Sequence, residues 1–380
     1  MLRSNPEEMV RKTMAKFVDK EVIPVANELD RKGDFPDELF KKLADMGALG
    51  IRYPQKAGGS GGNTTLYCIT MQELARGLMS LAAVTAMQGL MATNGLYLYG
   101  TKQMHEEFLY PALKGEKIGA FQLTEPDAGS DLGSVRTRAR KTSDGYVING
   151  MKTWSTNGPK GDFHTVLCQT DPDKGLKGLA FFFIPGSTPG FSHSKKFDTL
   201  GTRTSSLSEI YFNDCHIPSE YRLGEEGKGL KVLLTILAEI RIMTACLALG
   251  LHQAAMHDSI KYSKQRIQFG KPIGNYQLIQ AKIANMAVNL EAGSLMVHKV
   301  THLIDKKIPC LNEATMAKYF TVESACKASD EAMRIFGGYG YSMEYSVQRY
   351  YRDNRFLLSG GGTHEVLQTT IAREIMAKYK

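Results

Sequence analysis

The chain has 380 residues, of which 43% are hydrophobic and 23% charged, a balance that indicates folded units with sizeable cores and argues against disorder. No apolar run reaches the ~18 residues of a membrane span, and the N-terminal MLRSNPEEMVRK lacks the apolar core of a secretory signal, so we expect a cytoplasmic protein without a membrane partner. The net charge is +8, and the basic residues are interleaved with acidic ones, which favours a phosphate-bearing small ligand over nucleic acid.

The cysteines indicate neither disulfides nor a metal centre. They include no CxxC pair, and no histidine stands at metal-binding spacing from them. We therefore expect no metal site. Reduced, partly buried thiols are expected at Cys68, Cys168, Cys215, Cys246, Cys310 and Cys326.

Helical and strand patterns alternate along the chain in three blocks. Apolar residues recur at three- and four-residue spacing over 5–119, which predicts helices around a glycine-rich loop at 54–62, with 72–99 buried on most sides. Short β-branched or aromatic segments between turn residues predict strands over 120–222. Helical spacing then returns and predicts long helices at 229–264, 277–304, 312–336 and 364–378.

This order predicts an α+β protein with three domains. The expected units are an N-terminal α-helical domain (1–119), a β domain (120–222) and a C-terminal helical bundle domain (223–380). A β module followed by long helices suggests a bundle packed against a small barrel.

Segments in each of the last two blocks match one known family in the expected order. They are FQLTEPDAGSD (121–131), KTWSTNG (152–158), RIQFGKPIGNYQLIQ (266–280), IFGGYGY (335–341) and YRDNRF (351–356). With these segments the chain resembles the acyl-CoA dehydrogenase superfamily. The resemblance implies FAD as cofactor, an acyl-CoA or enoyl-CoA substrate, and a helical domain, a β-barrel-like domain and a C-terminal four-helix bundle in that order. It also implies a homotetramer and electron transfer flavoprotein as a partner.

The resemblance assigns two segments to the flavin ring. Phe121, Leu123 and Thr124 would line it, and Ser130 would lie near the acyl-CoA. Trp154 would shield the other face of the flavin while Ser155 and Thr156 bond its edge, because hydroxyls and backbone N–H groups beside tight turns suit the ring nitrogens and oxygens. The alternative for Trp154 is a core anchor.

Further segments would bind the rest of FAD, partly from a neighbouring subunit. Arg266, Gln268 and Phe269 resemble the family's contact to the pyrophosphate and adenosine, for which the planar fork of an arginine is suited. Gly337 and Gly338 would let the backbone approach the same tail. A Rossmann site is excluded because no βαβ unit surrounds these glycines. The remaining assigned contacts to FAD are Arg334, Thr363 and Glu365.

The position of the usual catalytic carboxylate departs from the family pattern. Members abstract the α-proton of the thioester with a glutamate in a Tyr-Glu-Gly-Thr run after Arg-Asp. Counting from Arg352-Asp353, this chain has Gly360 in the place of the tyrosine and Gly361 in the place of the glutamate. A placed base contributes roughly 10²–10⁴ in rate, so its loss matters.

No other position offers an evident replacement. Some branches carry the base just before a helix arginine, but here Ile240 precedes Arg241, and the neighbouring Glu239 is a weak candidate because one residue turns a helix by about 100°. The buried helix over the acyl chain has no acid between Glu73 and Glu106 and would project Met91 into the pocket.

Two differences leave alternatives open. Arg241 is either a substrate-side residue or half of a helix-surface salt bridge. Glu365 and Arg334 each replace a common glutamine, and together they either form a new ion pair or alter the affinity for FAD.

Three functions remain in view. The first is an acyl-CoA oxidoreductase for a bulky, cyclic or polar acyl or enoyl thioester, since the Gly360–Gly362 run would widen the pocket. The second is a redox-neutral lyase similar to a desulfinase, disfavoured because residues 81–90 contain no arginine to grip a sulfinate. The third is an inactive FAD- or CoA-binding homologue, against which the intact flavin segments argue.

Overall fold

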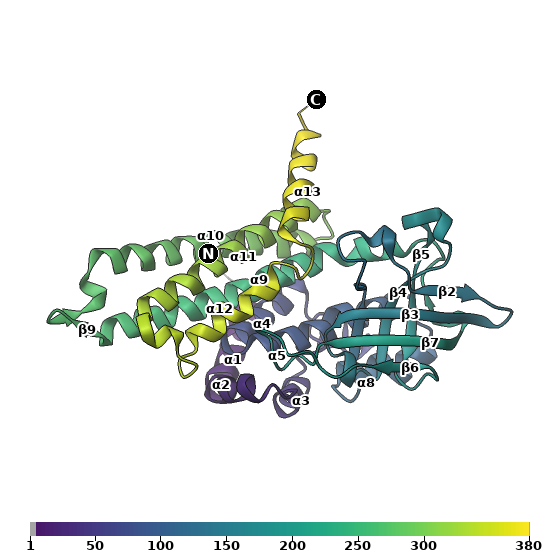
Figure 1. Cartoon of the computed structure of the whole chain (residues 1–380), viewed down its shortest axis with the longest axis horizontal. Helices are drawn as coiled ribbons and strands as arrows, with labels where there is room; N and C mark the ends of the chain where they lie inside the picture. The colour runs from purple at the N-terminus through teal and green to yellow at the C-terminus, as the bar shows by residue number, and fades with distance from the viewer. Residues whose placement is uncertain (1–4, 380) are drawn as a thin grey trace.

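The computed structural model describes residues 5–379, so residues 1–4 of the predicted N-terminal domain, with the start of the N-terminal stretch, and Lys380 lie outside the described residues. A helical region, a β region and a second helical region follow one another along the chain (Figure 1). The α+β prediction is confirmed.

The N-terminal region is built of short helices with sharp ends. Asn63 begins α4 by accepting a hydrogen bond from the N–H of Leu66, and Gly33 ends α2 at φ 71°, a conformation that glycine adopts without strain. The elements are α1 (Asn5–Phe17), η1 (Val18–Val22), α2 (Ile23–Lys32), α3 (Asp37–Asp45), η2 (Gln55–Ala57), α4 (Thr64–Gly77), α5 (Met79–Ala86), η3 (Met87–Ala92), α6 (Thr93–Tyr99), α7 (Lys102–Met104), η4 (His105–Leu109) and α8 (Tyr110–Leu113).

The buried helical stretch over 72–99 is not one continuous helix. Leu78 leaves helical geometry at φ −147°, which separates α4 from α5, and η3 is a π-helical turn between α5 and α6. Such π turns often accompany functional sites because they re-aim the side chains that follow. The expected burial holds, since nearly every residue of α5 and η3 is buried.

The β region forms one eight-stranded sheet in the order β6-β7-β3-β2-β4-β5-β8, with β1 paired in parallel to β4. Its alternating side chains face two separate cores: Phe181 and Phe183 of β5 join the helical core, while Phe182 and Ile184 lie in a second core. The strands are β1 (Gly119–Gln122), β2 (Arg138–Lys141), β3 (Gly145–Ser155), β4 (Phe163–Gln169), β5 (Leu179–Pro185), β6 (Phe191–His193), β7 (Ser208–Pro218) and β8 (Arg222–Leu223).

The C-terminal region is organised around α9, a 37-residue helix that packs against α4, α10 and α11. Within the described residues α9 alone is long and apolar enough to cross a membrane, and 72% of its most apolar window is buried inside the protein. The elements are α9 (Gly229–Gln265), β9 (Ile267–Gln268), β10 (Lys271–Pro272), η9 (Ile273–Asn275), α10 (Gln277–Asp305), α11 (Leu311–Phe336), η10 (Gly337–Tyr341), α12 (Val347–Leu357) and α13 (His364–Met376).

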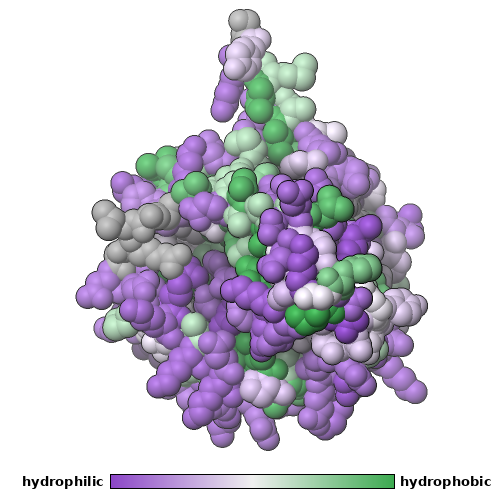
Figure 2. Space-filling model, turned by 90° about the vertical axis from the view of Figure 1, so that its left-hand side faces the viewer, coloured by the Kyte–Doolittle hydropathy of each residue, from purple (hydrophilic) through white to green (hydrophobic). Residues whose placement is uncertain are grey.

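The two ends of the molecule carry different secondary structure. The sheet occupies one end, the β9–β10 hairpin lies at the opposite end, and α13 projects from the body (Figure 1). Viewed from the hairpin end, hydrophobic residues form a column below the projecting helix (Figure 2). All six cysteines are buried free thiols, more fully buried than expected.

Candidate active site

A buried ion pair holds the loop after β1. Lys152 on β3 donates to Glu125 at 2.7 Å and to the carbonyl of Leu123 at 2.9 Å, while Glu125 also accepts from the backbone N–H of Arg136 and of Thr137. The carbonyl of Thr124 accepts from the N–H of Thr153. The predicted loop residues Leu123 and Thr124 are therefore fixed at the edge of the sheet, half-buried, with Phe121 buried behind them.

Trp154 is displayed on the surface at the end of β3. Its side chain is 59% exposed, its backbone has φ 57°, and its ring contacts Phe197 at 5.0 Å between centroids. This exposure excludes the alternative of a core anchor. The next two residues, Ser155 and Thr156, are buried, and Ser155 Oγ accepts from Gln122 Nε2. Ser130 lies on the exposed part of the 126–131 loop.

A second group of predicted residues gathers at the hairpin end. The guanidinium of Arg266 lies 5.6 Å from the ring centroid of Tyr339, which places it beside the glycine-rich η10 segment. Phe269, at the hairpin tip, is 95% exposed, and Gln268 is exposed as well. Open space surrounds Gly337 and Gly338, because a Cβ at either position would meet nothing within 4 Å.

The hairpin residues are far along the chain and in space from the glycine run. Arg241 and Arg266 are joined by helix α9, and 25 residues of helix span about 37 Å at 1.5 Å per residue. The hairpin lies at the end of the molecule opposite the sheet (Figure 1). That the hairpin residues reach the FAD of a neighbouring subunit stays a prediction.

The glycine run after α12 adopts a conformation that favours glycine. Gly361 has φ 73° and Gly362 has φ 105°. A Cβ at Gly361 would lie 3.2 Å from Thr244 Oγ1 and 3.5 Å from Ile240 Cγ2, so this position faces α9. A Cβ at Gly360 would meet the ring of Phe356 at 3.1 Å, so the expected widening does not extend to Gly360.

Two buried cations lie beneath this run. Arg241 is 5% exposed, donates from Nη1 to Thr315 Oγ1 at 2.6 Å, and has no recorded partner for Nε. Lys318 is 0% exposed and donates to the carbonyl of Gly362. Burial lowers the pKa of the Arg241 guanidinium, and burial together with Arg241 lowers the pKa of the Lys318 ammonium to about 7. The salt-bridge alternative for Arg241 is excluded among the described residues.

The acidic residues weighed as replacement bases are already paired with arginines. Glu239, the weak candidate base, forms an ion pair with Arg52, which also donates to Asn94. Glu73 is buried between Arg11 and Arg76. Both carboxylates are therefore engaged by arginine side chains in the described structure.

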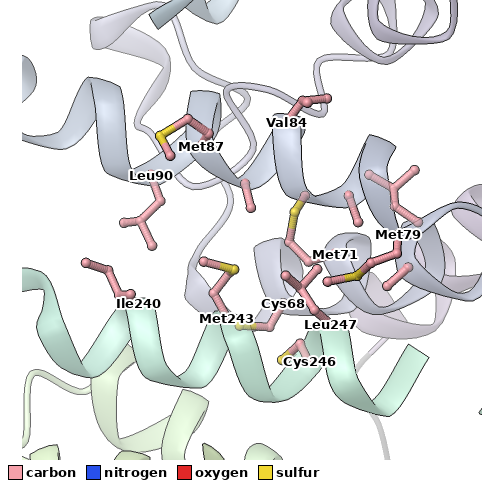
Figure 3. Packing of buried hydrophobic residues seen from close by; sticks show 14 of the residues in the cluster. Cys68, Met71, Met79, Val84, Met87, Leu90, Ile240, Met243, Cys246 and Leu247 are labelled. Atoms are coloured by element: carbon pink, nitrogen blue, oxygen red, sulfur yellow. The ribbon is translucent and has the colours of Figure 1, made fainter. Parts of the chain in front are cut away.

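The buried core between α9 and the elements α4, α5 and η3 is rich in methionine. Ile240 and Met243 of α9 face Leu90 and Met87 of the π turn, with Met71 and Met79 beside them (Figure 3). Met91, the residue predicted to project toward the acyl chain, is the half-buried member of an otherwise buried η3. Methionine side chains adapt to irregular groups and make favourable contacts with aromatic rings.

The remaining predicted contacts lie near the start of α13 and the end of α11. Thr363 caps α13 by accepting from the N–H of Val366. Arg334 is exposed and bonds Asp330 at 2.7 Å, so the proposed ion pair between Arg334 and Glu365 does not form in the described structure. Glu365 is exposed.

Lys318 was missed by sequence reasoning. Its signal is a lone lysine in ATMAKYF, four residues after Ala314 and four before Val322, both buried on the same helical face. Arg52, just before the glycine-rich loop, was also missed, because its partner Glu239 is distant in sequence.

The residues at hand fit the predicted FAD. The exposed ring of Trp154 offers a flat surface for the flavin, and Thr124 and Thr156 supply hydroxyl groups just after β1 and β3. The open space around Gly337 and Gly338 leaves room for a close approach of the cofactor to the backbone. Among the described residues no group of three or more His, Cys, Asp or Glu is placed to hold a metal.

Comparison with known proteins agrees along the whole chain. Models of the acyl-CoA dehydrogenase N-terminal, middle and C-terminal domains match residues 4–116, 120–215 and 227–376. Benzylmalonyl-CoA dehydrogenase of Aromatoleum aromaticum is 44% identical, over 98% of both chains. The 3-(aryl)acrylate reductase of Clostridium sporogenes is 38% identical, over 99% of this chain and 100% of that one. A glutaryl-CoA dehydrogenase from Mycobacterium smegmatis, solved with FADH2, superimposes with a TM-score of 0.94 at 31% identity, over 99% of this chain and 95% of the other.

Proposed function

Because this chain belongs to the acyl-CoA dehydrogenase family of FAD-dependent oxidoreductases acting on CH–CH bonds, we propose that it serves an atypical thioester bearing an aryl group, not a straight-chain acyl-CoA. The observation that carries the proposal is Gly361 at the place of the usual base, while the neighbouring candidate Glu239 is paired with Arg52. With an ordinary alkyl thioester as substrate, the enzyme would lack the carboxylate that removes the α-proton.

Two observations support an aryl group on the substrate: the methionines in the core next to η3, and the names of two relatives. Met87 and Met243 lie in the buried core near Leu90 and Ile240 (Figure 3), and methionine side chains make soft, adaptable contacts. Two of the similar proteins are named for aryl-bearing compounds, benzylmalonyl-CoA and 3-(aryl)acrylate.

Bound FAD supplies a two-electron acceptor or donor for hydride exchange at the β-carbon. The chain's own residues bind and orient: Thr124 and Thr156 would hold the edge of the ring, Trp154 would cover one face, and Ser130 would lie toward the CoA portion. We propose electron transfer flavoprotein as the physiological partner for those electrons.

The test is the flavin half-reaction against matched thioesters. The reduced holoprotein is mixed anaerobically with cinnamoyl-CoA or crotonyl-CoA, and flavin absorbance is followed. We expect cinnamoyl-CoA to bind at least tenfold more tightly, and to reoxidise the flavin faster. Equal response to both thioesters would remove the aryl preference.

The other two functions give different results in the same experiment. Consumption of thioester without a net change in flavin would indicate a redox-neutral lyase. An inert flavin that binds neither thioester would indicate an inactive homologue.

A further inference from the structure

A strap between β6 and β7 connects the end of β3 to helix α12. The strap comprises residues 197–207. On one side it reaches β3: the ring of Phe197 contacts Trp154 at 5.0 Å between centroids, and the carbonyl of Ser205 accepts from the N–H of Asn157 at 3.2 Å. The strap therefore contacts the residues on either side of the pair that is predicted to bond the flavin edge.

The other side of the strap is fixed to α12. The N–H of Thr202 donates to Asp353 Oδ1 at 2.7 Å, and Arg352 Nη1 donates to the carbonyl of Leu200 at 2.8 Å. This approach leaves no room for a side chain at Gly201, whose Cβ would lie 2.6 Å from the backbone of Arg352. Asp353 is 0% exposed and Thr202 4%, so the bond between them is shielded from competing water.

The backbone along this connection is held in an unfavourable conformation. Seven residues other than glycine have a positive φ in the described part of the chain, and four of them lie here. They are Trp154 (57°), Asn157 (64°), Thr202 (48°) and Ser206 (46°). Such conformations persist only where surrounding contacts enforce them. We therefore expect the strap to relax when its anchor on α12 is removed.

We propose that Asp353 is a positioning residue that sets the orientation of Trp154 against the flavin. This inference rests on the proposed function, in which Trp154 covers one face of the flavin ring. Asp353 acts through the strap: it holds the N–H of Thr202, and Phe197 at the start of the strap supports the ring of Trp154.

The same helix leads directly into the glycine run. Helix α12 ends at Leu357, and the N–H of Gly360 donates to the carbonyl of Phe356 at 3.0 Å. Asp353 lies one turn before this end. One buried side chain thus fixes the flavin-side ring and the substrate-side turn relative to each other. Hydride exchange needs this because the reacting atoms must come within about 3–3.5 Å of each other.

The test uses Trp154 as its own reporter, because it is the single tryptophan of the chain. Its emission is measured in the FAD-loaded protein, per bound flavin, where a ring held against the flavin is quenched. Asp353→Leu removes the acceptor of the Thr202 N–H, and the loss of a hydrogen bond to a carboxylate should shift the balance toward the released strap by about tenfold or more. We expect Trp154 emission to rise and the melting temperature to fall. Asp353→Asn keeps an oxygen acceptor and should restore the wild-type emission.

Two further variants separate positioning from a loss of stability. Gly201→Ala pushes the strap away from the Arg352 backbone and leaves Asp353 in place, so it should raise Trp154 emission even where Asp353→Leu does not fold. Asp305→Leu is the matched control, because Asp305 also accepts backbone N–H bonds, at 2.8 and 3.1 Å, from the first two residues of α4. It should lower the melting temperature and leave Trp154 emission unchanged.

The outcomes separate this inference from the proposed function. Unchanged Trp154 emission in folded Asp353→Leu or in Gly201→Ala, or an equal rise in Asp305→Leu, would overturn the inference alone. Unquenched Trp154 in the FAD-loaded wild type would place the flavin elsewhere and overturn both. If the emission responds as expected but cinnamoyl-CoA does not reoxidise the wild-type flavin, the inference stands and the aryl-thioester function falls. Where both hold, Asp353→Leu should slow that reoxidation by up to about 10²-fold, the effect of a misplacement of about 1 Å.

Discussion

Gly361 is in the left-handed region of backbone space, which limits how a base can be restored there. Its φ of 73° costs a residue with a Cβ about 1–2 kcal/mol, and the new Cβ would press on Thr244 Oγ1. The backbone nevertheless aims position 361 at α9, where Ile240 lies.

We therefore predict that Gly361→Glu lowers the free energy of unfolding by about 1–2 kcal/mol, yet raises the rate of flavin reduction by 3-phenylpropanoyl-CoA, up to about 10²-fold. Gly361→Gln carries the same strain without a base and is the control. Stopped-flow absorbance and urea unfolding measure the two effects. Identical rates for the two variants would show that a missing base does not limit this reaction.

The buried Lys318 makes the stability of the ligand-free protein depend on pH. Its pKa is about 10.5 when unfolded and about 7 when folded, so the unfolded chain binds more protons between these values. The free energy of unfolding of the ligand-free protein should therefore rise with pH across that window.

Among the secondary-structure elements, β1 and β3 depend on each other through Lys152 and Glu125. Breaking one side of a buried ion pair costs about 3–5 kcal/mol, because the other charge stays buried. We predict that Lys152→Met destabilises the protein by this amount and releases FAD, since the 123–125 loop loses its anchor. Urea unfolding and flavin retention after gel filtration measure both.

Two further variants decide what the Lys152 change means. Lys177→Met removes an exposed lysine of the β region and should leave both measurements unchanged. Adding Glu125→Gln to Lys152→Met removes the stranded charge and should recover part of the stability. If Lys152→Met keeps its flavin fully, the loop does not depend on the pair.

The sequence predicted the elements with strong periodicity well and the rest poorly. Helices α9, α10 and α11 begin and end within a residue of the expected bounds, because long apolar stripes define them. Helix α12 was not predicted: Arg352 pairs with Asp30 and the buried Asp353 accepts from the N–H of Thr202, partners far away in the chain. The left-handed glycines and the Arg241–Lys318 pair depend on the same distant contacts, so local patterns do not reveal them.

At the scale of the whole molecule, we predict a homotetramer, or at least a homodimer. The hairpin lies at the end of the molecule opposite the sheet (Figure 1). Apolar side chains at Leu278 and Val288 on α10 and at Met376, the last residue of the projecting α13, are exposed to solvent in the single chain. Sedimentation should give a mass well above 42.1 kDa. A stable monomer that holds FAD would contradict this.

Substitutions on α10 and a matched substitution in the β region test where the subunit interface lies. Leu278→Glu combined with Val288→Glu should shift the protein to smaller species, because each buries a charge in an apolar contact. Leu176→Glu changes an equally apolar, exposed residue of the β region and should leave the assembly intact.

The β9–β10 hairpin has one more consequence, which concerns dilution. If Arg266 and Phe269 complete the cofactor site of another chain, then cofactor affinity and subunit association share one free energy. Lowering the protein concentration should loosen the flavin even at constant excess of free flavin, and adding flavin should draw separated chains together. A flavin content that follows protein concentration would thus report on the assembly itself, with no measurement of mass.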